Sequence, residues 1–363
     1  MSAGHSPPDV TRPLHRAGID APVVSLASLP TPFSRVQAGA LSLWLKDDGL
    51  ASPLYGGNKV RKLEYALAEV LQAGRQRVIT IGAVGSNHCV ATALHASRLG
   101  LEVELIQFPQ PPTAHVAVNV STALAAATTC TCLPHPALLP FWVGARRIAA
   151  ALSGGSTAYI PGGGSSVTGS LGFVNAGLEF AEQWRSAGSG ERPVIYVAAG
   201  TCGTLAGLIH GLRLARLPAH VVGVRVVDRI VTHVGVVSRL LRLLEQRVPV
   251  PHQPSAAASD LVSWELRDDQ FGAGYGIATP AGDAATGVAR AAGVGLEPTY
   301  TAKTFAALLS DLEAQRVSPA GAVYWHTLNA APLAPTAPRR IPPAYARYVA
   351  LLPPVQPQLP HAP

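Results

Sequence analysis

The chain has 363 residues, of which 48% are hydrophobic and 13% are charged. This length allows a large core and two lobes, and the low charge content argues against an intrinsically disordered protein. The formal net charge is +7, but the arginines are scattered singly or in pairs and aromatic residues make up only 6%. We therefore expect no nucleic-acid partner.

The first twenty residues contain no apolar core of a signal peptide. The most apolar stretch, residues 220–244, is interrupted by charged side chains. We therefore expect a cytoplasmic protein without membrane contact. No spacing typical of a metal site occurs among the cysteines, so we expect free thiols and no metal at Cys89, Cys130, Cys132 and Cys202.

Strands and helices alternate along most of the chain, after a flexible N-terminal arm expected at residues 1–22. A strand at 41–45 precedes a helix that begins near Asn58 and ends near Gly74. Further strands are predicted at 77–81, 102–108, 193–199, 221–227 and 321–326, and further helices at 88–99, 114–127, 137–152, 170–187, 280–292 and 301–314. Residues 247–272 show no regular pattern, and the chain after Pro332 is predicted to have little structure. This alternation indicates an α/β fold with a parallel sheet.

The clearest chemical signal lies in residues 56–64, GGNKVRKLE. Two glycines and an asparagine precede Lys59 at the start of a helix, where unsatisfied N–H groups and the helix dipole disfavour a cation. Burial would lower the lysine pKa further, and a neutral amine is the nucleophile that a carbonyl-binding lysine needs. The alternative is an ordinary solvated lysine, and position alone does not separate the two.

Four loops rich in Gly, Ser, Thr or Asn follow predicted strands, at 56–59, 82–88, 161–166 and 200–204. Ligands of open α/β sheets bind at the carboxyl ends of strands. The last loop could bind a phosphate through backbone N–H groups at a helix N-terminus, although such a turn can also be purely structural. It matches neither the P-loop nor the G-x-G-x-x-G pattern. A turn lysine, a phosphate-binding loop and no nucleotide motif together indicate pyridoxal phosphate.

Over residues 23–333 the sequence resembles the D-cysteine desulfhydrase / 1-aminocyclopropane-1-carboxylate (ACC) deaminase family of fold-type II pyridoxal-phosphate enzymes. The matching motifs are Leu29–Pro30–Thr31–Pro32, Lys46–Asp47–Asp48, residues 56–64, Ser86–Asn87–His88, residues 160–165, residues 200–208, Gly274–Tyr275–Gly276, residues 300–303 and His326–Thr327. The resemblance implies a two-lobed tryptophan-synthase-β-like fold with parallel-rich twisted sheets flanked by helices. We expect a large cofactor-binding domain at 23–61 and 169–333, a small domain at 62–168, a Pro-rich tail at 334–363 and a homodimer.

The resemblance also implies roles for individual residues. Lys59 would bind the cofactor covalently and move protons at the substrate Cα, Asn87 would bond its phenolic oxygen, and Ser86 would meet the substrate carboxylate. The implied catalytic residues are Lys59, Ser86, Tyr275 and Tyr300. The implied cofactor-binding residues are Asn58, Lys59, Asn87, Gly200, Thr201, Cys202, Gly203, Thr204 and Thr327. The implied substrate-binding residues are Ser86, Asn87, His88, Tyr275 and Tyr300. Taken singly, Ser86 and Asn87 could simply be helix-capping residues, and the two tyrosines could simply lie at the edge of a hydrophobic core.

The chain departs from the family pattern at Gly85, where glutamine is usual, at Cys202, where glycine is usual, and at Leu328–Asn329, where two glycines are usual. Thr301 and His88 stand where the deaminases carry an acid and a glutamine. These residues favour β-elimination from a small amino acid such as D-cysteine. ACC ring opening and a non-catalytic pyridoxal-phosphate-binding protein remain alternatives.

Overall fold

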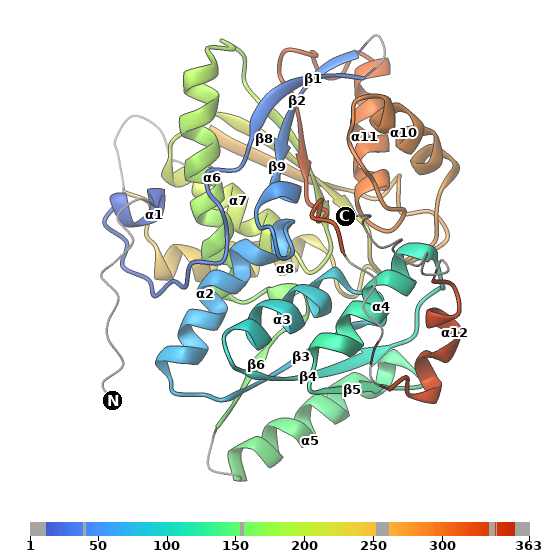
Figure 1. Cartoon of the computed structure of the whole chain (residues 1–363). Coiled ribbons are helices and arrows are strands. Elements are labelled where there is room, and N and C mark those ends of the chain that lie inside the picture. The colour runs from blue at the N-terminus through green and yellow to red at the C-terminus, as the bar shows by residue number, and fades with distance from the viewer. Residues whose placement is uncertain are drawn as a thin grey trace, which may run out of the picture.

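The structure is a computed structural model that describes residues 12–38, 41–152, 156–251, 261–333, 338 and 340–352. Its strands form two separate sheets, one in each lobe (Figure 1). The sheet of the large lobe runs in the order β1 (Phe33–Ala38), β2 (Leu41–Asp47), β10 (Ala322–His326), β7 (Val194–Ala199), β8 (Ala219–Arg225) and β9 (Val262–Arg267). The sheet of the small lobe runs in the order β5 (Thr129–Cys132), β4 (Glu102–Phe108), β3 (Arg77–Ala83) and β6 (Thr157–Ile160).

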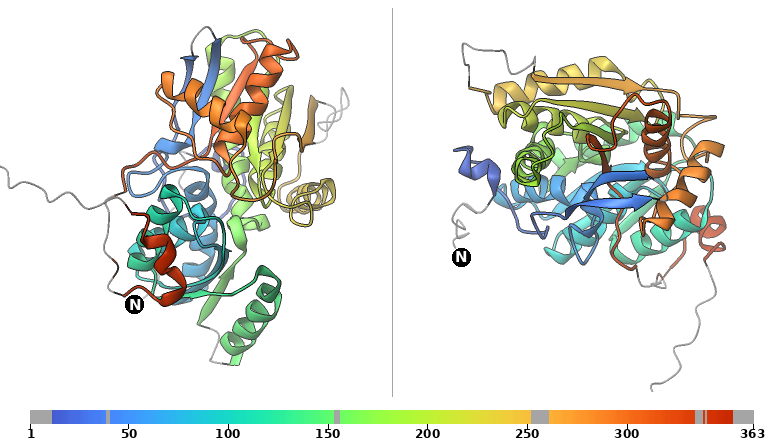
Figure 2. Two further views of the ribbon diagram at one scale, coloured as in Figure 1. Left: turned by 90° about the vertical axis from the view of Figure 1, so that its right-hand side faces the viewer. Right: turned by 90° about the horizontal axis from the view of Figure 1, so that it is seen from above.

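Among the described strands, β1 and β2 pair antiparallel and the other pairings are parallel. Parallel strands need covered faces, and β7 shows how this is achieved. Ile195 and Val197 point into a core with α6 (Val167–Ala187) and α7 (Gly203–Leu214), whereas Tyr196 points to the opposite face. That opposite face is covered by α10 (Pro280–Ala291) and α11 (Thr301–Glu313) (Figure 2). The predicted α/β class with parallel-rich sheets flanked by helices is confirmed.

The small lobe follows the same plan. Leu63, Val78 and Val103 belong to a core shared by the sheet, α2 (Asn58–Gln72) and α3 (Asn87–Arg98). The other helices of this lobe are α4 (Ala114–Ala126) and α5 (Leu139–Leu152). No residue of α5 is buried, and this helix projects from the base of the molecule in Figure 2.

The region predicted to be irregular contains a strand, and a helix that was not predicted precedes it. Within 247–272, β9 pairs in parallel with β8, and residues 252–260 lie outside the described ranges. The preceding helix α8 (Val234–Arg247) packs through Val237 and Leu244, which are fully buried. Both elements carry local patterns that the prediction did not use, since β9 alternates apolar and polar residues and α8 is amphipathic, and they contact β8 and α7.

Both ends of the described chain pack onto the lobes. In the predicted N-terminal arm, α1 (Pro13–Arg16) buries Leu14 completely, and Arg12 forms a buried ion pair with Glu64 at 2.6 Å. In the predicted tail, η4 (Pro343–Tyr345) and α12 (Ala346–Val349) lie beside α4 (Figure 1). The expectation of little structure after Pro332 is therefore wrong for residues 343–349.

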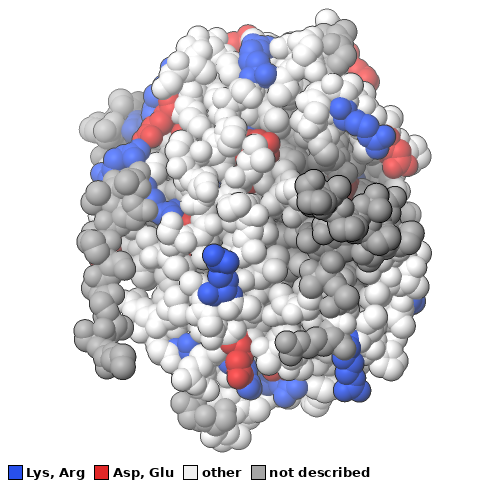
Figure 3. All heavy atoms as spheres, in the orientation of Figure 1, with Lys and Arg blue, Asp and Glu red and all other residues white. Residues whose placement is uncertain are grey.

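The surface carries its charges in small groups. On the face shown in Figure 3, Lys and Arg side chains are separated by neutral surface. Within the described ranges, no helix combines the length and apolarity needed to cross a membrane.

A buried ion network joins α2 to the large lobe. The Arg61 guanidinium donates to both Glu179 oxygens, at 3.0 and 2.9 Å, and to Asp48 Oδ1 at 2.9 Å. Lys46 Nζ donates to Glu179 at 2.5 Å, and the Trp325 indole N–H donates to Asp48 Oδ2 at 2.8 Å. Burial alone raises the Glu179 pKa, but the charges of Arg61 and Lys46 outweigh it and hold this pKa at about 2. The Lys46–Asp47–Asp48 motif thus has a structural role in this chain.

We expect Glu179→Gln to lower the free energy of unfolding by about 3–5 kcal/mol near neutral pH, because it leaves two buried cations, Lys46 and Arg61, with Asp48 as the one remaining carboxylate of the network. The pKa of Glu179 is depressed, so its contribution is present above about pH 4.3 and disappears as the pH falls toward 2. Urea denaturation across this range should therefore show a weaker loss of stability in the variant than in the unmodified protein. Glu182→Gln is the matched control, since Glu182 lies on the same helix in an exposed pair with Arg16 and should cost less than about 1 kcal/mol. Equal effects of the two substitutions would contradict this account of the network.

Candidate active site

A cavity of about 750 Å³ lies between the lobes, where loops that follow β3, β7 and β10 meet. Ligands of parallel sheets bind at this end of the strands. Most of the predicted site residues line the cavity: Asn58, Lys59, Ser86, Asn87, His88, Gly200, Thr201, Cys202, Thr204, Tyr275, Tyr300 and Thr327. Gly203 is not in the wall itself, but its backbone N–H donates to Ser165 Oγ at 3.1 Å.

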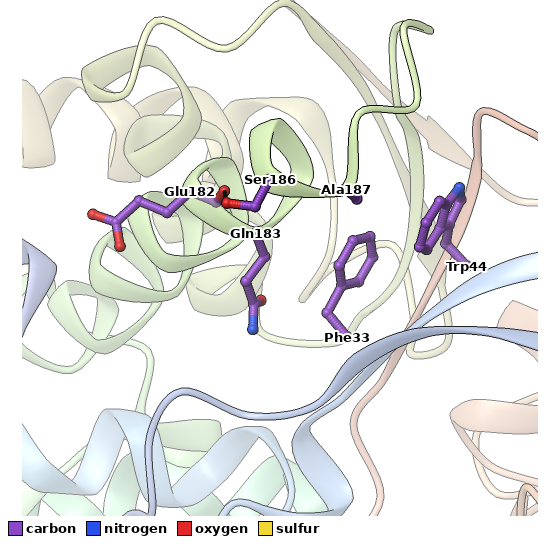
Figure 4. Close-up of a pocket in the computed structure, with 6 residues that line it drawn as sticks. All are labelled: Phe33, Trp44, Glu182, Gln183, Ser186 and Ala187. Carbon is purple, nitrogen blue, oxygen red and sulfur yellow. Dashed lines mark hydrogen bonds between the residues drawn. The ribbon is translucent and has the colours of Figure 1, made fainter.

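A second hollow, of about 380 Å³, lies on the outer side of the large lobe. Its wall consists of Phe33, Trp44, Glu182, Gln183, Ser186 and Ala187 (Figure 4). None of the predicted site residues reaches it, and its only ionisable group, Glu182, pairs with Arg16 at the surface. The cavity between the lobes is therefore the candidate active site.

Lys59 lies in the first turn of α2, on a turn held against the end of β10. Gly57 has φ of +81°, and a Cβ there would lie 2.6 Å from the Thr327 carbonyl oxygen, so this position requires glycine. The next backbone N–H, of Asn58, donates to that same oxygen at 3.2 Å. Desolvation in the cavity wall lowers the Lys59 pKa to about 8. The neutral amine is thus far more accessible here than in an ordinary lysine.

The loop after β7 presents a set of donors at the N-terminus of α7. Thr201 Oγ1 lies 2.6 Å from Ser165 Oγ, which also accepts from Gly203 N–H. Asn58 Nδ2 donates to Thr204 Oγ1 at 3.1 Å, which ties this loop to the lysine turn. Hydroxyls and N–H groups at a helix N-terminus suit a phosphate group.

Lys62 adds an amine to this donor set, and sequence reasoning did not include it in the site. Its Nζ donates to Ser165 Oγ at 3.2 Å and to the Gly163 carbonyl at 3.0 Å, and its side chain lines the cavity. Burial and the charge of Lys59 hold the Lys62 pKa well below its usual value. A phosphate dianion beside it would favour its charged form. The signal in the sequence was its spacing of three residues from Lys59, which places both on one side of α2.

The loop after β3 orients Asn87. Its Oδ1 accepts from the Tyr55 hydroxyl at 3.0 Å and from Asn119 Nδ2 at 2.7 Å, which leaves the Asn87 Nδ2 as a donor at the cavity wall. Ser86 caps α3, as its Oγ accepts from Cys89 N–H at 3.4 Å. The helix-capping interpretation of Ser86 is therefore confirmed, and the same residue still lines the cavity.

His88 also lines the cavity. Thr80 Oγ1 donates to the Ile160 carbonyl and lies 2.8 Å from His88 Nε2, so this network assigns the proton to Nε2. Burial and the charges of Lys59 and Lys62 hold the His88 pKa well below its usual value. His88 is therefore neutral at physiological pH.

Tyr275 and Tyr300 meet in the wall, with their hydroxyl oxygens 2.6 Å apart. Burial raises the pKa of both phenols, so both are protonated near neutral pH. Glu297, also missed by sequence reasoning, holds this region in place by accepting from the N–H groups of Thr299, Tyr300 and Thr301. Its Oε1 lies 3.3 Å from Thr301 Oγ1, and both residues line the cavity.

Of the residues that depart from the family pattern, some line the cavity and others lie outside its wall. Cys202 and Leu328 line the cavity. Cys202 is buried with φ of +62°, a conformation that glycine adopts without strain, and burial raises its thiol pKa to about 11. Asn329 instead accepts from Gly56 N–H through its Oδ1 at 2.7 Å and supports the lysine turn.

This donor set fits pyridoxal phosphate. Lys59 offers an amine of lowered pKa, the loop after β7 and Lys62 offer donors for the phosphate, and Asn87 Nδ2 offers a donor for the phenolic oxygen. The cavity volume lies in the range that cofactor and small-molecule sites occupy.

Comparison with known proteins agrees with this chemistry. Residues 24–327 match the family of pyridoxal-phosphate dependent enzymes. The chain belongs to this family, and its cofactor is pyridoxal 5′-phosphate.

Comparison with individual proteins gives more specific similarities. D-cysteine desulfhydrase of Klebsiella pneumoniae is 31% identical over 323 residues, which is 86% of this chain and 94% of the relative. The crystal structure of an ACC deaminase homologue superposes with a TM-score of 0.70 at 26% identity, covering 96% of this chain and all of the homologue. O-ureido-L-serine synthase shares the fold, with a TM-score of 0.54 at 16% identity over 84% of this chain and 88% of the other. The predicted resemblance and fold are confirmed.

We expect Lys59→Ala to abolish the covalent link to the cofactor and Lys62→Ala to preserve it. Borohydride reduction followed by peptide mass spectrometry should find the cofactor on Lys59 in the unmodified protein and in the Lys62 variant. The Lys62 variant should nevertheless bind the cofactor about 10- to 100-fold more weakly, because it loses a charge-assisted hydrogen bond to the phosphate. Cofactor found on Lys62 in the Lys59 variant would overturn the assignment.

Proposed function

We propose that this chain is a lyase that catalyses β-elimination from D-cysteine or a closely related β-substituted D-amino acid. The overall reaction consumes water and releases pyruvate, ammonia and sulfide from D-cysteine. The observation that carries the proposal is the lysine of lowered pKa facing Ser86, Asn87 and two neutral phenols across one cavity. The 31% identity with a D-cysteine desulfhydrase supports the substrate class.

Each step has a group in the cavity wall. When bound, pyridoxal phosphate supplies an electron sink for the negative charge that develops at the substrate Cα. Lys59 removes the Cα proton, which suits an amine with a pKa of about 8. Ser86 and the N–H groups at the start of α3 bind the substrate carboxylate. Tyr275 and Tyr300 are protonated and bonded to each other, so the pair orients the substrate and keeps one hydroxyl proton to donate to the leaving group.

Opening of the ACC ring is a second candidate, and one observation favours it. The Glu297 carboxylate lies beside Thr301, the position where the resembling deaminases carry an acid. This carboxylate already accepts hydrogen bonds from three backbone N–H groups at the start of α11, and these bonds stabilise its negative charge. A carbon leaving group needs more assistance than a thiolate, whose conjugate acid has a pKa of about 8.5. The elimination is therefore the better supported reaction.

We also propose that the protein acts in the cytoplasm as a homodimer. Large apolar side chains stand exposed on α5, with Phe141 at 73%, Ile148 at 64% and Leu152 at 84%. A second copy that covers such side chains would remove apolar surface from water. Light scattering of the purified holoenzyme should therefore give twice the chain mass, and a monomer at micromolar concentration would contradict this proposal.

A substrate panel tests the reaction. Ammonia and keto-acid release should be measured side by side from D-cysteine, L-cysteine, β-chloro-D-alanine and ACC. We expect a β-substituted D-amino acid to turn over at least about tenfold faster than ACC, because thiolate and chloride leave without protonation of a carbon. The Lys59→Ala variant is the control and should be inactive throughout. Faster turnover of ACC would favour the deaminase, and no turnover at all would favour a non-catalytic binding protein.

A further inference from the structure

The C-terminal segment, residues 341–352, contacts the small lobe close to the active-site loop. Tyr345 and Tyr348 from this segment are at most 1% exposed. They form one apolar cluster with Val84, Val116 and Val120. Figure 1 shows α12 alongside α4, and contacts between the two helices agree. This segment is therefore part of the folded small lobe, although it lies beyond the residues matched to the enzyme family.

The two tyrosine hydroxyls bond to residues at the end of β4. Tyr345 OH donates to Gln107 Oε1 at 2.9 Å, and Tyr348 OH donates to the Gln110 carbonyl at 3.1 Å. Gln107 also bonds to the loop after β3, because its Nε2 donates to the carbonyl oxygens of Ala83 and Val84 at 3.2 and 3.1 Å. One side-chain amide thus connects the C-terminal segment with the loop that carries Ser86 and Asn87.

The same loop is held closely from α4. Asn119 Nδ2 donates to the Gly85 carbonyl at 2.9 Å and to Asn87 Oδ1 at 2.7 Å. A Cβ on Gly85 would lie 2.8 Å from Gln110 Nε2 and 2.7 Å from Val116 Cγ2. The backbone of the loop therefore sits directly on this surface, with no room for a side chain between them.

From these contacts we propose that Tyr345 and Gln107 are positioning residues for the substrate-binding loop 83–87. The inference rests on the proposed function, in which this loop binds the substrate carboxylate. Lys59 and the phosphate-binding loop lie on α2 and after β7, so they do not depend on this chain of contacts. Loosening the loop should weaken substrate binding, whereas the covalent link to Lys59 and the phosphate-binding loop should be kept.

Tyr345→Phe in the holoenzyme tests this proposal, since it removes one hydroxyl and keeps the buried ring. We expect KM for the substrate to rise about three- to tenfold with kcat within about twofold, as one hydrogen bond is lost. The cofactor should remain attached to Lys59, as borohydride reduction and peptide mass spectrometry would show. Tyr159→Phe is the matched control, because Tyr159 lies on β6 in the same lobe outside the cavity wall and should leave KM unaltered.

Hydrogen exchange provides a readout that needs no substrate. Peptides covering 83–90 should exchange at least about threefold faster in Tyr345→Phe, whereas peptides covering 200–208 should not change. Unchanged exchange at 83–90 overturns the proposal, and so does faster exchange without a rise in KM. Lack of turnover by the unmodified protein would instead refute the proposed function, and the exchange result would still decide whether the segment holds the loop.

Discussion

The buried charges around Arg61 constrain the rest of the structure. Removing charges from water is costly, and the cost is offset only when every charge has bonded partners in good geometry. Here two cations and two carboxylates satisfy one another across α2, α6 and the end of β2. These elements can therefore adopt only one relative arrangement. Lys59 lies two residues before Arg61 on the same helix, so its position relative to the large lobe follows from this network.

Close backbone contacts make this arrangement more precise. A Cβ on Gly172 of α6 would lie 2.0 Å from the Arg61 carbonyl oxygen, so α2 and α6 touch without intervening side chains. Just before α2 begins, Gly57 lies equally close to the backbone of Thr327, where a Cβ would be 2.6 Å from the carbonyl oxygen. Packing of this kind leaves little freedom for α2 to shift. The amine is consequently presented from a rigid element, as covalent catalysis requires.

Local signals explain which elements the sequence predicts. The strand at 102–108 has the predicted bounds, and the helix at 280–291 differs by one residue, because hydrophobic period and flanking glycine or proline define both. The edge strand β9, which pairs with β8, also alternates polar and apolar residues, and the prediction did not use this local strand signal. The helix at 346–349 is held by Tyr345 and Tyr348, whose burial partners lie more than two hundred residues earlier in the chain. No local pattern encodes such contacts.

The same distinction applies to the site. The lysine turn and the loop at 200–204 could be predicted because a positive φ and a helix start impose local residue requirements. Lys62 and Ser165 are brought together by a contact between residues 103 positions apart, which their local sequence does not encode. Tertiary contacts also explain two residues that depart from the family pattern. Asn329 bonds to the lysine turn, and Gly85 leaves the space that the Gln110 side chain occupies. Neither of these two lines the cavity, so Cys202 and Leu328 are the departures from the shared family pattern that lie in its wall. Differences in specificity from the relatives should therefore arise first at these two side chains.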